Sequence, residues 1–200
     1  MRNLFPLFFA LFFFALSSCS RDNNTQYESV PVVESESQVL GASPKARHQV
    51  FMAKLPALPL PFTATCAFQY KEAKEPDSMV VGTYVKEFEK VYKKIQVSPN
   101  VEAILAIYPT DDLLPRLRTF DHQGTVLDEQ DLKFNPCGEE PGFQHSEQLT
   151  IQKDLTIVIL DSTARWEFDA AYQEIPKTRK LTVTKRTFKV LDTGEIIEVK

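Results

Sequence analysis

The sequence predicts a mostly β domain, either a β-sandwich or a partly closed antiparallel meander or barrel, with one amphipathic helix packed on it. From about residue 103 onward, apolar residues alternate with polar ones in short runs, which is typical of strands. Turn residues separate these runs, and consecutive strands joined by short turns form antiparallel meanders. An α+β fold is the fallback, because one earlier segment has helical spacing.

The N-terminal segment predicts export and lipid attachment. Residues 4–16 are apolar almost without interruption and follow the basic residue Arg2, as in a secretory signal. This run is shorter than the about 18 residues that a membrane-spanning helix needs. Leu16-Ser17-Ser18-Cys19 resembles, at every position, the lipobox of bacterial lipoproteins, which implies acylation of Cys19. The alternative is an ordinary signal peptide cut near Ser18 or Ser20.

This interpretation divides the chain into three parts. Residues 1–18 are a lipoprotein signal peptide, residues 19–47 are the lipidated cysteine and a flexible tether, and residues 48–200 are a single globular β-rich domain. The tether is polar and charged, and such a composition buries too little apolar surface to fold. The expected membrane partner is the lipid bilayer, which acylated Cys19 enters.

The charge balance argues against nucleic acid as a partner. Loss of residues 1–18 removes one basic residue of 23, so 22 Lys and Arg remain against 27 Asp and Glu, a net charge of −5. Proteins that bind nucleic acid usually carry a basic excess. Basic residues still gather late in the chain, where we expect either a solvated strand face or a surface for an acidic partner. They are Arg165, Lys177, Arg179, Lys180, Lys185 and Arg186.

Cysteine usage fits an exported protein. With Cys19 lipidated, Cys66 and Cys137 remain as a pair, and disulfides persist outside the cytosol. A bridge between them would close a loop of about 70 residues and contribute about 4 kcal/mol. Two buried free thiols are the alternative, and the sequence does not decide between the two.

Two segments precede the strand-rich half. Residues 55–62 alternate apolar residues with prolines, which predicts an extended edge segment rather than a central strand. Residues 81–95 place apolar side chains at steps of three and four, and Asp77 or Ser78 can cap them. We therefore expect the amphipathic helix at residues 81–95, ending before Pro99.

Strands are expected over the rest of the chain. Residues 103–108 predict a buried central strand, and residues 117–121 and 125–127 predict a hairpin in which Gly124 supplies a positive φ. Residues 135–142 predict a long exposed loop. The other strands are expected at residues 148–151, 155–160, 165–168, 180–190 and 195–199.

Two of the expected strand regions change the parity of their apolar residues. Odd-numbered positions are apolar up to Ile159, whereas Ala164 and the following apolar positions are even-numbered. The segment 180–190 changes in the same way between Leu181 and Phe188. We interpret each change as a β-bulge or a bend.

The sequence predicts no catalytic, metal or cofactor site. The histidines His48, His122 and His145 lie outside any nucleophile or metal-ligand motif, and no glycine-rich phosphate loop is present. An envelope hydrolase or a metal-dependent enzyme is the alternative function. It would need dispersed residues to converge, and the candidates are Asp121, His122, Glu140 and His145.

Several features together resemble uncharacterised envelope lipoproteins of the Bacteroidota type. They are the lipobox, the polar tether, the Leu-Pro-Leu-Pro-Phe segment at residues 58–62 and the Phe-Asp-x-x-Gly hairpin at residues 120–124. The resemblance implies a lipid-anchored protein of the cell envelope, with the outer membrane favoured and a periplasmic or surface face, and it carries no catalytic residues. We expect a non-enzymatic binding or assembly module with an envelope protein as partner. An inhibitor or immunity protein is a third interpretation.

Overall fold

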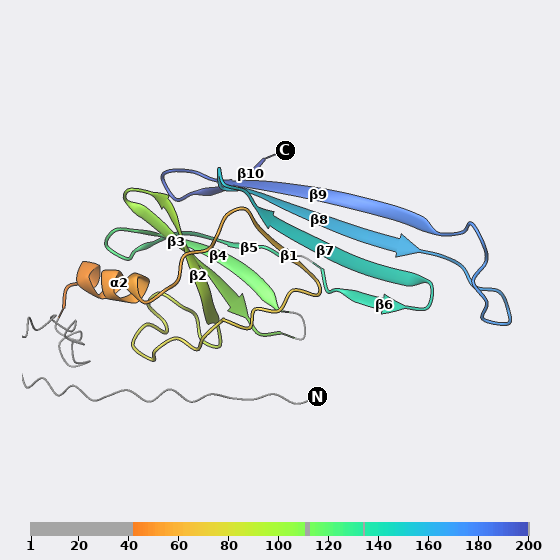
Figure 1. Cartoon of the computed structure of the whole chain (residues 1–200), viewed down its shortest axis with the longest axis horizontal. Helices are drawn as coiled ribbons and strands as arrows, with labels where there is room; N and C mark the ends of the chain where they lie inside the picture. Colours follow the sequence, from red (N-terminus) through yellow and green to blue (C-terminus); the bar gives the residue numbers. More distant parts are fainter. Residues whose placement is uncertain (1–41, 111–112, 134, 200) are drawn as a thin grey trace, which may run out of the picture. The chain divides into compact units, whose positions relative to one another are not determined.

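Ten strands form two antiparallel sheets, and one short helix packs against one of them (Figure 1). The computed structural model describes residues 42–110, 113–133 and 135–199, and these counts refer to that part of the chain. The described residues all belong to one unit, Ser35–Lys200. The elements are α2 (Pro44–Ala53), β1 (Phe62–Thr65), β2 (Lys90–Ser98), β3 (Val101–Tyr108), β4 (Leu114–Asp121), β5 (Val126–Asp131), β6 (Gly138–Glu140), β7 (Phe143–Ile151), β8 (Thr156–Arg165), β9 (Lys180–Val190) and β10 (Ile196–Val199).

Both sheets are built mainly from consecutive strands, as the predicted meander requires. The first, sheet A, has the order β2-β3-β4-β5, and the second, sheet B, has the order β1-β7-β8-β9-β10 with β6 paired to β7. The predicted hairpin joins β4 to β5, and its Gly124 has a φ of 86°. Gly194 has a φ of 93° in the turn between β9 and β10. The mostly β fold class with one helix is therefore confirmed.

The main core lies between the two sheets. Sheet A contributes Leu105 and Leu117, and sheet B contributes Ile157 and Phe188, all of them almost fully buried. The proline-containing segment before β1 runs along this core and buries Leu58, and β1 is an edge strand of sheet B. Burial of each such side chain contributes roughly 1.5–3 kcal/mol, so this layer holds the two sheets together.

The helix covers the opposite face of sheet A. The side chain of Ser43 accepts a hydrogen bond from the amide of Ala46 at 3.3 Å, and Pro44 occupies the first turn, so the helix has a standard start. Phe51 and Met52 pack there with sheet A residues such as Phe120. Within the described residues, no helix is long and apolar enough to cross a membrane.

The helix predicted at residues 81–95 is wrong, because residues 90–98 form β2. Val91 faces the core under α2 and its neighbour Tyr92 faces the core between the sheets; a register shift after Val91 places Ile95 on the same side as Tyr92. A strand that is buried on both faces and carries a bulge imitates helical spacing. The real helix begins at Pro44, so residues 44–47, which were expected in the tether, are folded.

Parts of β6 to β9 extend beyond sheet A as an arm (Figure 1). We define the arm as residues 138–147 and 161–185, which include the connection between β8 and β9. The β8–β9 ladder has no register shift along its length, so the predicted bulges in these strands are wrong. The parity of the apolar residues changes because both strands leave the core, and residues 180–185 are all exposed.

Candidate functional site

The cysteines that the sequence singled out fall into two groups. Cys19 lies outside the described residues. Cys66 and Cys137 form a disulfide with an S–S distance of 2.00 Å and a Cα–Cα distance of 5.8 Å. Cys66 follows β1 and Cys137 precedes β6, so the bridge joins the edge of sheet B to the start of the arm.

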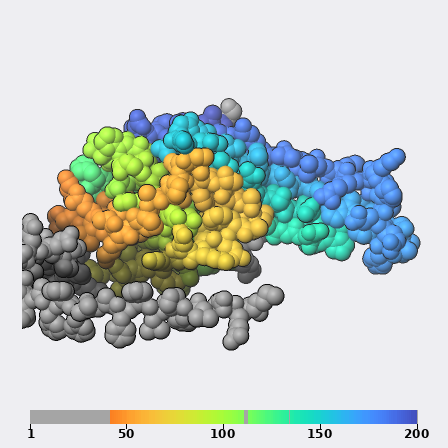
Figure 2. Space-filling view, in the orientation of Figure 1, coloured from red at the N-terminus to blue at the C-terminus, as the bar shows by residue number. Residues whose placement is uncertain are grey.

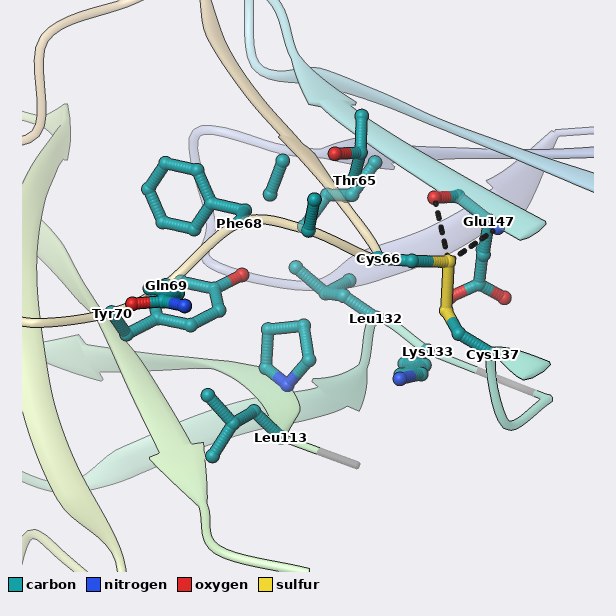
Figure 3. Close-up of a pocket in the computed structure, with 14 residues that line it drawn as sticks. Thr65, Cys66, Phe68, Gln69, Tyr70, Leu113, Leu132, Lys133, Cys137 and Glu147 are labelled. Carbon is teal, nitrogen blue, oxygen red and sulfur yellow. Dashed lines mark hydrogen bonds between the residues drawn. A yellow bond between two sulfur atoms is a disulfide. The ribbon is translucent and has the colours of Figure 1, made fainter. Parts of the chain in front are cut away.

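A small hollow lies beside this disulfide (Figure 3). It has a volume of about 240 Å³, which is below the roughly 300 Å³ of a typical small-molecule site. Figure 3 shows Phe68 and Tyr70 on one side of the hollow and the disulfide on the other. Burial, followed by the nearby Tyr92, raises the pKa of Tyr70, so its hydroxyl stays protonated and is a poor base. These features indicate a structural role.

The four residues named for a dispersed active site do not converge. Asp121 and His122 lie at the β4–β5 turn of sheet A, whereas Glu140 and His145 lie on β6 and β7 of sheet B. The carboxylate of Asp121 accepts hydrogen bonds from the amides of the turn residues Gln123 and Thr125, at 2.8 Å each. Within the described residues, no three His, Cys, Asp or Glu side chains are arranged to hold a metal ion.

His145 has its own structural partners. One ring nitrogen, Nδ1, is 2.5 Å from the carbonyl oxygen of Pro136, and the other, Nε2, is 2.6 Å from Oδ1 of Asp161. These contacts tie the segment before β6 to β7 and β8. The imidazole is therefore occupied in holding the base of the arm together.

His48 of α2 is a buried polar residue that sequence reasoning did not select. It is 1% exposed, and neither ring nitrogen has a hydrogen-bond partner among the described residues. The nearest acidic atom is Oε2 of Glu102, 3.6 Å from Nε2. Burial lowers the pKa of His48, and the negative charges of Glu102 and Asp121 oppose this shift. A buried neutral imidazole of this kind affects stability.

A second buried polar group lies between sheet A and the segment before β2. Glu89 is fully buried, and its carboxylate accepts hydrogen bonds from Nη1 and Nη2 of Arg118 at 3.0 and 3.1 Å. It also accepts one from Nη1 of Arg116 at 2.8 Å and one from the amide of Lys86 at 2.9 Å. Burial alone would raise the pKa of Glu89, but these hydrogen bonds outweigh it, so the pKa is lowered. This network fixes the segment rather than presenting reactive groups.

The arm exposes apolar side chains to solvent. Figure 2 shows it projecting from the rest of the folded unit as the blue and teal region at the right. Tyr172, in the connection between β8 and β9, is 84% exposed, and Leu181 and Val183 on β9 are 67% and 53% exposed. Exposed apolar side chains on a projecting element are typical of an interaction surface.

One side of the arm is an open strand edge. β8 pairs with β9 along its whole length, whereas β10 pairs only with Thr187–Val190. Residues 180–186, which we call the β9 edge, therefore have a strand partner on one side only within the described part of the chain. Figure 1 shows β9 along the rim of sheet B, with β10 beside one of its ends. Such an edge presents unpaired N–H and C=O groups.

The β9 edge is also basic. Lys180 and Lys185 are exposed, and neither has an ion-pair partner among the described residues. Arg186 is bound to Glu198 of β10 through Nε at 2.9 Å and Nη2 at 3.2 Å. The sequence identified these basic residues, but it did not show that they lie along an open edge.

Comparisons with known proteins identify no relative of this chain. No protein-family model, curated protein or solved structure matches this chain.

Proposed function

We propose that this protein is a lipid-anchored lipoprotein of the cell envelope whose β-rich domain binds a protein partner through its arm. The anchor is the acylated Cys19 of the lipobox-like segment, and the residues up to 41 connect it to the folded unit. The domain contributes binding rather than catalysis. Its partner is an envelope protein.

The observation that carries the binding role is the open, partly apolar surface of the arm. A protein in water rarely exposes apolar side chains beside unpaired backbone groups on an element that leaves the core. Leu181 and Val183 do so on β9, and Tyr172 adds an exposed aromatic side chain at the end of the arm. Recognition by an added strand or by a flat apolar patch needs this combination.

Cell fractionation tests the anchor. Cys19→Ala should move the protein from the membrane fraction to the soluble fraction, because acyl chains provide the membrane affinity. Ser20→Ala, which changes the neighbouring residue and keeps the thiol, should remain in the membrane fraction. Retention of the Cys19→Ala protein in the membrane would contradict the anchor.

Site-specific photocrosslinking in intact cells tests the arm. The photoreactive residue p-benzoylphenylalanine replaces Val183 or Tyr172 on the arm, or the exposed Lys71 elsewhere as a control. The two arm positions should capture the same protein, and Lys71 should not. The captured protein, once purified, should bind the full chain and lose at least tenfold in affinity to Val183→Asp. Identical products from all three positions would rule out the arm as the binding surface.

A further inference from the structure

We infer that the β9 edge binds an extended, acidic polypeptide segment of the partner, which adds to sheet B as a further strand. This inference rests on the proposed binding role of the arm and identifies the chemistry of its partner. Strand addition gives affinity through backbone hydrogen bonds, and side chains at alternate positions give specificity. The β9 edge supplies both requirements, as the following observations show.

The backbone of the β9 edge has room for another strand. Residues 187–190 already bind β10 on the same side, so the sheet accepts a neighbour there. Beyond β10 the ladder on this side stops, although β9 continues as regular strand to Lys180 and stays paired with β8. In a strand paired on one side, every second residue directs its N–H and C=O to the open side. An incoming strand would continue the line of β10 toward the end of the arm.

The charge of the edge selects an acidic segment. Its charged residues are Lys180, Lys185 and Arg186, and it contains no acidic residue. The two lysines have no ion-pair partner among the described residues and are free to meet carboxylates of an added strand. Opposite charges on directly facing residues of neighbouring strands stabilise the pair, and like charges destabilise it.

The side chains of the edge define the pattern that the added segment needs. Leu181, Val183 and Lys185 occupy alternate positions and therefore share one face of the sheet. Leu181 and Val183 offer apolar contacts to β-branched or aliphatic side chains of the segment. A segment with alternating acidic and aliphatic residues places its aliphatic side chains beside these two on one face, and its carboxylates on the other face, which carries Lys180.

The same charges disfavour a second copy of this chain on the edge. If two β9 edges paired antiparallel with Val183 opposite itself, Lys180 of one copy would face Arg186 of the other. Lysines on an open edge are a common protection against such self-pairing. The charges of the β9 edge therefore disfavour pairing with a second β9 edge and favour pairing with an acidic segment.

A peptide-binding measurement tests the inference. The probe is a fluorescein-labelled ten-residue peptide of alternating glutamate and valine, and the protein is the full chain purified in detergent. Fluorescence anisotropy should show binding at least tenfold tighter than that of the same peptide with lysine in place of glutamate. A peptide with every backbone amide N-methylated keeps its charge but cannot donate hydrogen bonds, and it should also bind at least tenfold more weakly.

Matched charge reversals locate the binding. The double variant Lys180→Glu, Lys185→Glu should bind the acidic peptide at least tenfold more weakly than the natural chain does. Lys71→Glu combined with Lys153→Glu makes the same charge change at two exposed lysines outside the arm and should leave the affinity within twofold. Circular dichroism of each variant establishes that it is folded.

Hydrogen exchange on the unaltered chain decides the binding mode without any variant. The acidic peptide should protect amides of residues 180–186 and leave β1, the opposite edge of sheet B, unchanged. Absence of binding, equal binding of the N-methylated peptide, or protection elsewhere would overturn the inference. If the arm captures a partner in cells but the acidic peptide does not bind, only this inference is contradicted. If Cys19→Ala stays in the membrane or the arm captures nothing, the proposed function falls while the peptide result stands.

Discussion

His48 shows how a single buried side chain makes stability depend on pH. Its pKa is lowered by burial, against the raising effect of Glu102 and Asp121, whereas an unfolded histidine titrates near pH 6.5. Below about pH 6.5 the unfolded chain therefore binds a proton that folded His48 resists. The free energy of unfolding should be highest above this pH and should fall as the pH drops.

Urea unfolding at pH 7.5 and pH 5.5 measures this effect. The natural chain should lose stability at the lower pH, and His48→Phe, which keeps an aromatic ring but does not titrate, should lose less. An equal loss in both proteins would assign the pH dependence to other groups.

The buried carboxylate of Glu89 is a second residue with a large expected effect. Glu89→Gln keeps the size of the side chain but leaves Arg118, which is 2% exposed, without its buried counter-charge. Removal of one partner from a buried ion pair costs about 3–5 kcal/mol. Chemical unfolding of the variant should show a loss of this order.

The control for Glu89 is another carboxylate on the same arginine. Glu129 lies 3.1 Å from Nε of Arg118, but its side chain is 37% exposed. Exposed ion pairs contribute about 0–1 kcal/mol, so Glu129→Gln should be nearly neutral. Similar losses in the two variants would show that burial does not determine the strength of this network.

At the scale of elements, the disulfide holds β1 and the segment before β6 together. The bridged cysteines are 71 residues apart in sequence, and closing a loop of that length stabilises a protein by about 4 kcal/mol in the chain-entropy model. A reducing agent should therefore lower the thermal unfolding midpoint. The double variant Cys66→Ser, Cys137→Ser should unfold at the same lower temperature with or without reductant. An unchanged midpoint in the reduced natural chain would contradict this role.

Most strands of the second half of the chain were predictable because their signals are local, but β6 lies within residues 135–142, where a loop was expected, and residues 166–168, which were expected in a strand, lie beyond the end of β8. Glycines with positive φ, such as Gly124 and Gly194, mark the turns, and apolar alternation marks the strands between them. β2 was not predictable by spacing alone, because both of its faces are buried and a register shift disturbs the alternation. The helix was missed although Ser43-Pro44 is a good start signal, because α2 is short and buries only His48, Phe51 and Met52.

The candidate site was only partly predictable. The basic residues late in the chain were visible in the sequence, and so was the cysteine pair. The open edge was not, because it depends on where β10 stops pairing with β9, and pairing between strands is a property of tertiary structure. Asp121 and His145 were grouped by chemistry, but the topology places them in different sheets.

At the scale of the whole folded unit, α2, sheet A and sheet B form three stacked layers, with sheet A in the middle. α2 covers one face of the sheet, and sheet B covers the other. Among the described residues, the strands at the centre of sheet A are therefore deeply buried, whereas β9 in the arm exposes Leu181 and Val183. The arrangement separates the part that maintains the fold from the part that is available for contacts.

The bridge between Cys66 and Cys137 also sets the path of mechanical load through the chain. Tension between the two chain ends would pass directly from Cys66 to Cys137 across the sulfur atoms. The 70 residues between them, which include all of sheet A, would carry none of it. At about 3.4 Å per extended residue, a molecule pulled by its ends with the disulfide intact would therefore extend about 240 Å less than the reduced molecule.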